Sequence, residues 1–166
     1  MRLSARALGL GAAASALALD QGHKFFMLRL FDIEAHMPIR ATSFLDVTLS
    51  WNYGVSYSFF QAHDDAARWG LLAFQLAVIA GLAVWMLRSD ARLRAGALGL
   101  IVGGALGNAA DRLHYGAVAD FFFLHTDLPV GPLANYVFNV ADVAISLGVF
   151  FLIIDSFRAP PQEAKA

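Results

Sequence analysis

Two aspartates lie in sequence surroundings that are costly for a charge. Asp120 stands in "AVADFFFL" and Asp142 in "FNVADVAISLGVFFLI", and neither has a cation close by in the sequence. Moving an isolated carboxylate out of water is expensive, so each needs a specific reason. For one such residue, a hydrogen bond to a neighbouring helix is as good an explanation as a chemical role. Two of them, near the outer ends of consecutive hydrophobic segments, favour a pair.

Two carboxyl groups at close range have a distinctive chemistry. They cannot both ionise easily, so they share one proton. The ionised group can then take a proton from water, while the protonated group polarises a carbonyl. Such a pair can hydrolyse a peptide bond, and the two aspartates therefore predict chemistry of the aspartic-peptidase type.

Other polar residues lie near the same ends. Asp20 and Lys24 are four residues apart, which predicts an ion pair on one helix, with Lys24 reaching toward the membrane interface. The adjacency of Asp111 and Arg112 predicts mutual charge compensation, with a further hydrogen bond from Asn108. One helical face carries four residues of this segment: Gly104, Asn108, Asp111 and Arg112.

Other chemistries have little support. The five histidines form no HExxH or HxH pattern, there is no GxSxG motif, and "GLGAAA" at 9–14 follows no strand. The absence of cysteine excludes disulfides and thiol nucleophiles. A net charge of -1 without a long basic run gives no nucleic-acid footprint. We therefore expect no metal, no organic cofactor and no nucleic-acid partner.

The composition predicts an all-α polytopic membrane protein. The chain is 58% hydrophobic and 15% charged, with a mean hydropathy of +0.58, whereas soluble domains are about a quarter charged. We expect a single domain, 1–166, with four transmembrane helices of about 20 residues each. Charges near its end interrupt the first span, and its basic start with "ASALALD" also matches a cleavable signal peptide, a less favoured alternative. The expected spans are about 4–28, 69–88, 95–115 and 137–157.

Basic residues predict the orientation. They precede the first span, occupy the short loop between the second and third, and follow the fourth: Arg2, Arg6, Arg88, Arg92, Arg94, Arg158 and Lys165. The positive-inside rule then places both termini in the cytoplasm. The segments 29–68 and 116–136 then face outward, and 121–136 is expected to be a loop.

The outer segment 29–68 contains a β pattern. In "TLSWNYGVSYSF" apolar and small polar residues alternate, which predicts a strand or hairpin in a platform at about 40–60. An open sheet edge cannot lie in lipid, so this extracytoplasmic β element is expected at the outer interface. Two interpretations of this element are equally supported: a plain connector that packs on the helix ends, or a surface that holds an extended peptide. Within the third span, Gly99, Gly103 and Gly107 predict close helix packing.

The chain resembles the lipoprotein signal peptidases, also called signal peptidase II. Four blocks carry the resemblance, in the family's order and spacing. They are "DQGHK" (20–24), "NYGVSYS" (52–58), "GGALGNAADRLHYGAVADF" (103–121) and "FNVADVAISLG" (138–148). The third and fourth together are highly specific, whereas the first alone is weak.

The resemblance implies that Asp120 and Asp142 form the catalytic pair. Residues implied to bind substrate or support the site are Asp20, Lys24, Asn52, Gly54, Gly104, Asn108, Asp111, Arg112, Asn139 and Ala141. The chain departs from the family pattern at four positions, which leave the aspartates intact but alter the substrate platform: His23, Val55, Tyr57 and Ala119.

The resemblance also implies the reaction. The family removes the signal peptide from diacylglyceryl-modified prolipoproteins and cuts on the N-terminal side of the lipidated cysteine. This implies a bacterial cytoplasmic (inner) membrane enzyme with its active site at the outer, periplasmic face. It also implies a monomer, contact with membrane lipid, and binding of inhibitors such as globomycin at the aspartates. There are two alternatives, a proton-coupled transporter or relay that uses these aspartates, and a structural membrane subunit. Both are far less favoured than the peptidase.

Overall fold

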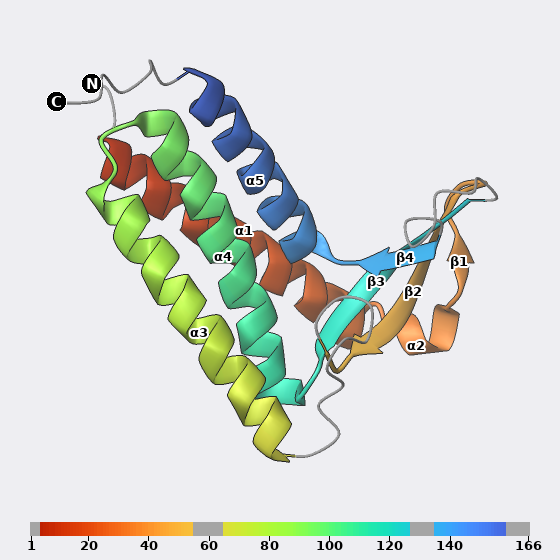
Figure 1. The fold of residues 1–166 in the computed structure, drawn as a ribbon. Coiled ribbons are helices and arrows are strands. Elements are labelled where there is room, and N and C mark those ends of the chain that lie inside the picture. The colour runs from red at the N-terminus through yellow and green to blue at the C-terminus, as the bar shows by residue number, and fades with distance from the viewer. Residues whose placement is uncertain (1–3, 55–64, 127–134, 159–166) are drawn as a thin grey trace, which may run out of the picture.

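The computed structural model describes residues 4–54, 65–126 and 135–158, with the backbone alone at 65–68. It is a helical bundle with a small sheet at the end opposite the termini (Figure 1). The helical elements are α1 (Ala5–Phe25), the π-helical turn η1 (Phe26–Leu30), α2 (Ile33–His36), α3 (Asp65–Arg88), α4 (Arg92–Tyr115) and α5 (Val140–Arg158). The strands are β1 (Ile39–Arg40), β2 (Leu45–Asn52), β3 (Val118–His125) and β4 (Asn135–Phe138).

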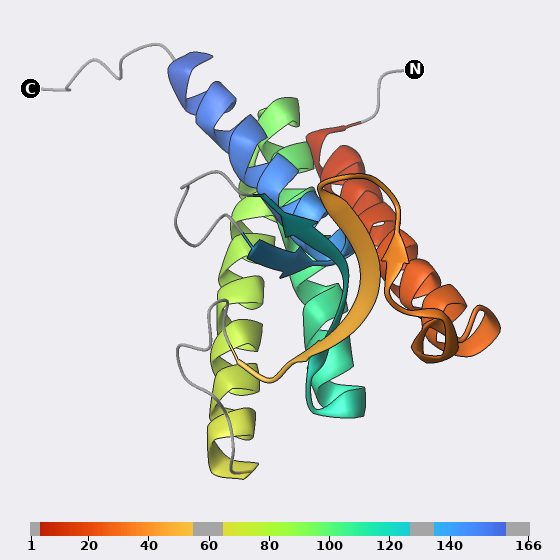
Figure 2. The same ribbon diagram turned by 90° about the vertical axis from the view of Figure 1, so that its right-hand side faces the viewer.

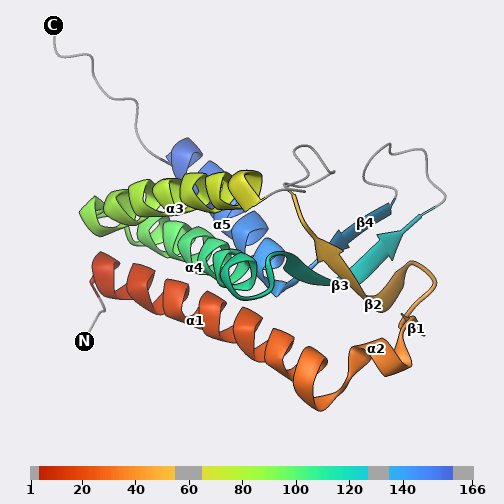
Figure 3. The ribbon, with the colours of Figure 1, turned by 90° about the horizontal axis from the view of Figure 1, so that it is seen from below.

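Helix α4 is the centre of the bundle, with α1 on one side and α3 and α5 on the other (Figure 3). Its glycines allow backbones to touch. A Cβ at Gly103 would collide with the carbonyl oxygen of Ala13 on α1, and one at Gly104 would lie 2.6 Å from that of Ala141 on α5. The close packing predicted for Gly99, Gly103 and Gly107 is confirmed, because all three face α1.

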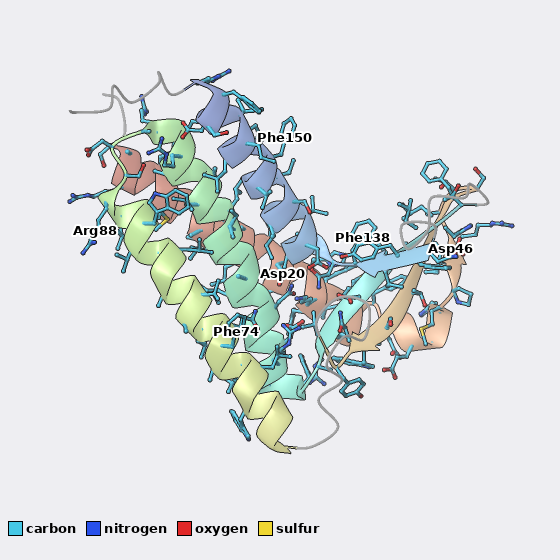
Figure 4. All side chains as sticks on the ribbon, in the orientation of Figure 1. Asp20, Asp46, Phe74, Arg88, Phe138 and Phe150 are labelled. Carbon is cyan, nitrogen blue, oxygen red and sulfur yellow. The ribbon has the colours of Figure 1, made fainter. Side chains whose placement is uncertain are left out.

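The outer surfaces of α3 and α5 are apolar. Phe74 and Phe150, for example, are more than half exposed, and Phe150 lies at the outer edge of α5 (Figure 4). Among the described residues, three helices are long and apolar enough to cross a membrane, over Trp69–Arg88, Arg92–Tyr115 and Val140–Arg158. The last begins three residues later than expected, because β4 occupies the chain just before it. Such surfaces suit contact with lipid chains.

The sheet is larger than the sequence predicted. Four antiparallel strands lie in the order β1-β2-β3-β4, and only β1 and β2 fall within the expected platform at 40–60. The sequence analysis assigned no strand to 116–136 and named 121–136 as a loop, but β3 and the start of β4 lie there. Gly116, at a φ of 82°, ends α4 and turns the chain into β3. The second half of the predicted alternation, including Val55 and Tyr57, lies outside the described residues.

Both faces of the sheet are partly covered. Every residue of β2 is therefore half-buried, and buried and exposed positions do not alternate along the strand. On β3, Ala119 and Phe121 pack with Met27 and Ile33 below one face. Successive side chains of a strand point to opposite faces. Asp120 therefore faces the other way, toward the helix ends.

Candidate active site

Asn139 connects the two predicted aspartates. Its side-chain Nδ2 donates to Asp120 Oδ1 at 2.6 Å, and its backbone N–H donates to Asp142 Oδ2 at 3.0 Å. Asn139 itself is fully buried. The two carboxyl groups therefore lie on either side of one asparagine, where the sheet meets the bundle.

Asp120 is held by the register of the sheet. The sequence placed it at the end of a membrane span, but it lies on β3, opposite Ser50 of β2. Its Oδ2 accepts from Asn52 Nδ2 at 3.3 Å, and Asn52 is oriented in turn by the N–H of Gly54, which donates to its Oδ1. Burial, and then the charge of Asp142, raise the pKa of Asp120 to about 7. This carboxyl therefore holds a proton more readily than an exposed aspartate does.

Asp142 is held by the first turn of α5. Asn139 Oδ1 accepts from the N–H of Asp142 at 3.0 Å, while Asp142 Oδ2 accepts from the N–H of Asn139. This reciprocal pattern is a capping box, which satisfies two N–H groups at the helix start. The other oxygen, Oδ1, accepts from Asn108 Nδ2 at 3.1 Å. Helix α5 and helix α4 thus fix the Asp142 carboxyl from two sides.

A buried charge cluster lies behind the pair. Lys24 Nζ is 2.8 Å from Asp20 Oδ2 and 2.7 Å from Asp111 Oδ2, and it also donates to Asn108 Oδ1 at 3.2 Å. Lys24 is only 2% exposed. The predicted Asp20–Lys24 ion pair is confirmed, but Lys24 does not reach the interface. It stays inside because Asp111 and Asn108 on α4 supply acceptors that lipid lacks.

The cluster also holds the backbone beside each aspartate. Asp111 Oδ2 accepts from the N–H of Ala119, the residue before Asp120, at 3.1 Å. Asp20 Oδ1 accepts from the N–H of Ala141, the residue before Asp142, at 2.9 Å. Lys24 joins the two acceptors, so one cation links the supports of both carboxyls.

Arg112 does not have the predicted role toward its neighbour. The ion pair of Asp111 is with Lys24, whereas Arg112 donates from Nη2 to the carbonyl of Gly54 at 2.8 Å and from Nη1 to Gln75 Oε1 at 3.1 Å. Adjacent residues on a helix point in different directions, so adjacency does not make a pair. Arg112 instead joins α4 to α3 and to the end of β2.

The structure brings the predicted site residues together from five elements and the residues beside them. Asp20 lies inside the bundle, near its junction with the sheet (Figure 4). His23, which departs from the family pattern, contacts the rings of Phe121 and Phe122. The predicted residues come from α1, β2, α4, β3 and α5 or from their flanks.

Two glutamines were missed by the sequence analysis. Gln21 Nε2 lies within hydrogen-bond distance of Asp111 Oδ1, the Gly107 carbonyl and Asp20 Oδ2. Gln75 binds the carbonyl of Ala105 as well as Arg112. For Gln75 the available signal was a polar residue within an otherwise apolar stretch, whereas Gln21 lies among polar residues in "DQGHK" and had no such signal. Over 4–54, 65–126 and 135–158 no group of three or more acidic or histidine side chains could hold a metal ion.

The fold is that of a known membrane enzyme. A bacterial membrane enzyme solved by the in meso method superposes with a TM-score of 0.73 at 22% identity, over 95% of this chain and 94% of that one. The fold and site thus define a polytopic membrane protein with a bundle, a sheet and paired aspartates between them.

The sequence comparisons show the family. The model of signal peptidase (SPase) II matches residues 12–158. The lipoprotein signal peptidase of Methylorubrum extorquens (strain PA1) is 51% identical over 93% of this chain and 88% of its own length. The lipoprotein signal peptidase of Beijerinckia indica subsp. indica is 48% identical over 99% of this chain and 96% of its own length. The chain belongs to the signal peptidase II family, as the motifs predicted, and the transporter alternative is not supported.

Proposed function

We propose that this chain removes the signal peptide from diacylglyceryl-modified prolipoproteins, by cutting on the N-terminal side of the lipidated cysteine. Asp120 and Asp142 are the catalytic pair in this proposal. The single observation that carries it is Asn139, which hydrogen-bonds both carboxyls at once. The proposal includes action as a monomer, which the family resemblance implies.

In this proposal the two carboxyls begin the reaction in different protonation states. Asp120, with its pKa raised to about 7, carries the shared proton and polarises the scissile carbonyl. Asp142 takes a proton from the attacking water. A transition state is stabilised most by groups that are already in place before the reaction. Here the side chains of Asn52, Asn108 and Asn139 donate to the carboxyls and hold them before substrate binds. No step requires a metal or organic cofactor, and inhibitors such as globomycin would bind at this pair.

The proposal includes four spans, with the site at the outer face of the bacterial cytoplasmic membrane. Helix α1 has 21 residues, or about 31 Å at 1.5 Å per residue, close to the thickness of the hydrocarbon core. Its charges Asp20 and Lys24 face α4 instead of lipid. Exposed arginines at the other end, Arg88 and Arg92 among them, favour a cytoplasmic location for the termini.

The test is a cleavage assay with purified protein in detergent. A prolipoprotein carrying the diacylglyceryl group is expected to be cut, and the product followed by gel shift. The matched substrate, with the same peptide but a free cysteine, is expected to be cut at least about tenfold more slowly, because it lacks the acyl chains that contribute binding energy. Equal cleavage of both substrates, or of neither, would contradict the proposal.

The rate should depend on pH through Asp120. With a pKa of about 7, this carboxyl is protonated at pH 6 and ionised at pH 8. kcat/KM is therefore expected to fall as pH rises through 7, by about tenfold per unit well above it, because the pair loses its last proton. An Asp46→Asn variant, altered at the far tip of the sheet, should give the same profile (Figure 4). A rate that stays constant from pH 6 to 9 would refute the assignment of the proton.

A further inference from the structure

An apolar groove lies at the other end of the bundle, far from the aspartates. At the sheet end, α1 and α5 are joined by the hydrogen bond from the N–H of Ala141 to Asp20. Toward the termini the two helices diverge on either side of α4 (Figure 2). The space between them is a groove of about 470 Å³. Its floor on α4 includes Gly96, Ala97 and Leu100, and Phe151 of α5 forms part of one wall.

The groove has the size and chemistry of a ligand site. Its volume falls within the range of roughly 300–1,000 Å³ seen for small-molecule pockets. Every lining residue is apolar or glycine except Arg92. Small residues, Gly11 and Ala12, line it from α1. It fits an unbranched hydrocarbon with one charged end.

Arg92 supplies the charge that this occupant must complement. It is exposed and makes no hydrogen bond or ion pair within the described residues. It is the first residue of α4, whose first turn contains no acid and whose N-cap, Ala91, provides no side-chain hydrogen bond. The nearby carboxylate of Asp155 is neutralised by Arg94 at 2.8 Å. Asp90 lies two residues before Arg92, but no ion pair joins the two among the described residues, so the Arg92 guanidinium at the positive end of α4 can still bind an anion.

We infer that this groove binds one acyl chain of an anionic phospholipid, with its phosphate at Arg92. The hydrocarbon would replace the side-chain contacts missing between α1 and α5, and the phosphate would accept from the guanidinium and from the free N–H groups of α4. Anionic lipids are abundant in the leaflet that the proposed orientation gives to this end. The lipid would stabilise the packing of α1 and α5 and would take no part in the chemistry of the site.

Native mass spectrometry of the purified full-length protein tests this inference. The protein is titrated in detergent with phosphatidylglycerol or phosphatidylcholine. One phosphatidylglycerol is expected to remain bound after other lipids are stripped. Gly11→Leu should abolish this adduct, because a side chain there meets nothing within 4 Å and enters the groove. Arg92→Gln, an exposed change that leaves the core intact, should weaken it about tenfold.

Two control variants match these changes. Gly81→Leu on α3 also has open space at its Cβ, and Arg88→Gln removes an exposed arginine outside the groove, so both should keep the adduct. Equal retention of the two lipids, or an unchanged adduct in Gly11→Leu and Arg92→Gln, would overturn the inference. So would a protein dimer that Gly11→Leu disrupts, because the groove would then hold a second copy. The readout does not depend on peptidase activity.

Discussion

Replacing Asp120 or Asp142 with asparagine is expected to lower kcat by about 10³-fold or more. Asparagine keeps the size of the side chain but can neither take a proton from water nor give one to the substrate. Each acid–base role contributes roughly 10²–10⁴-fold, and neither carboxyl can act without its partner. KM should change little, since the substrate platform remains. The cleavage assay with the lipidated substrate measures both constants.

The controls are aspartates on the same kinds of element. Asp155→Asn alters the other end of α5, where the carboxylate pairs with Arg94. Asp46→Asn alters β2, next to β3, where the carboxylate lies 3.4 Å from His125. Both variants should keep near-native turnover. If Asp120→Asn or Asp142→Asn also stayed within tenfold of the unmodified protein, the catalytic pair would have to be assigned elsewhere.

Replacing Lys24 with methionine is expected to destabilise the protein by about 3–5 kcal/mol. Methionine keeps most of the length of the lysine side chain. It leaves Asp20 and Asp111, which are at most 1% exposed, without their shared cation. Breaking a buried pair from one side leaves an uncompensated charge, which accounts for the large effect. Unfolding in mixed detergent–SDS micelles measures the free energy of unfolding.

A half-exposed ion pair provides the comparison. Arg94→Met breaks the pair with Asp155, whose two side chains are 35% and 13% exposed, so a smaller loss of about 1 kcal/mol is expected. Adding Asp20→Asn and Asp111→Asn to Lys24→Met should recover part of the lost stability, because the orphaned charges are removed. A Lys24→Met protein as stable as Arg94→Met would show that the cluster is not the support described above.

The same variant should also lose activity. Asp20 and Asp111 hold the N–H groups of Ala141 and Ala119, next to the two proposed catalytic residues. Without Lys24 the two carboxylates repel each other, and the supports of the pair move apart. Activity that falls in proportion to the folded fraction alone would limit Lys24 to a structural role.

The sequence by itself determined the class of protein and the residues of interest. The apolar composition left few places for a charge, so Asp120 and Asp142 stood out without any knowledge of the fold. The apolar runs likewise located α3, α4 and α5 to within a few residues, since a membrane span needs a fixed length of apolar chain. These are local properties, and a local reading of the chain recovers them.

Only the tertiary structure decided how these residues meet. Asp120 lies on a strand because β2, about 70 residues earlier, pairs with it. Asp111 binds Lys24 from 87 positions away instead of its neighbour Arg112. Asp20 reaches the N–H of Ala141 across 121 positions. Helix packing and strand register set these contacts, and no local pattern specifies which distant acceptor a buried charge will find.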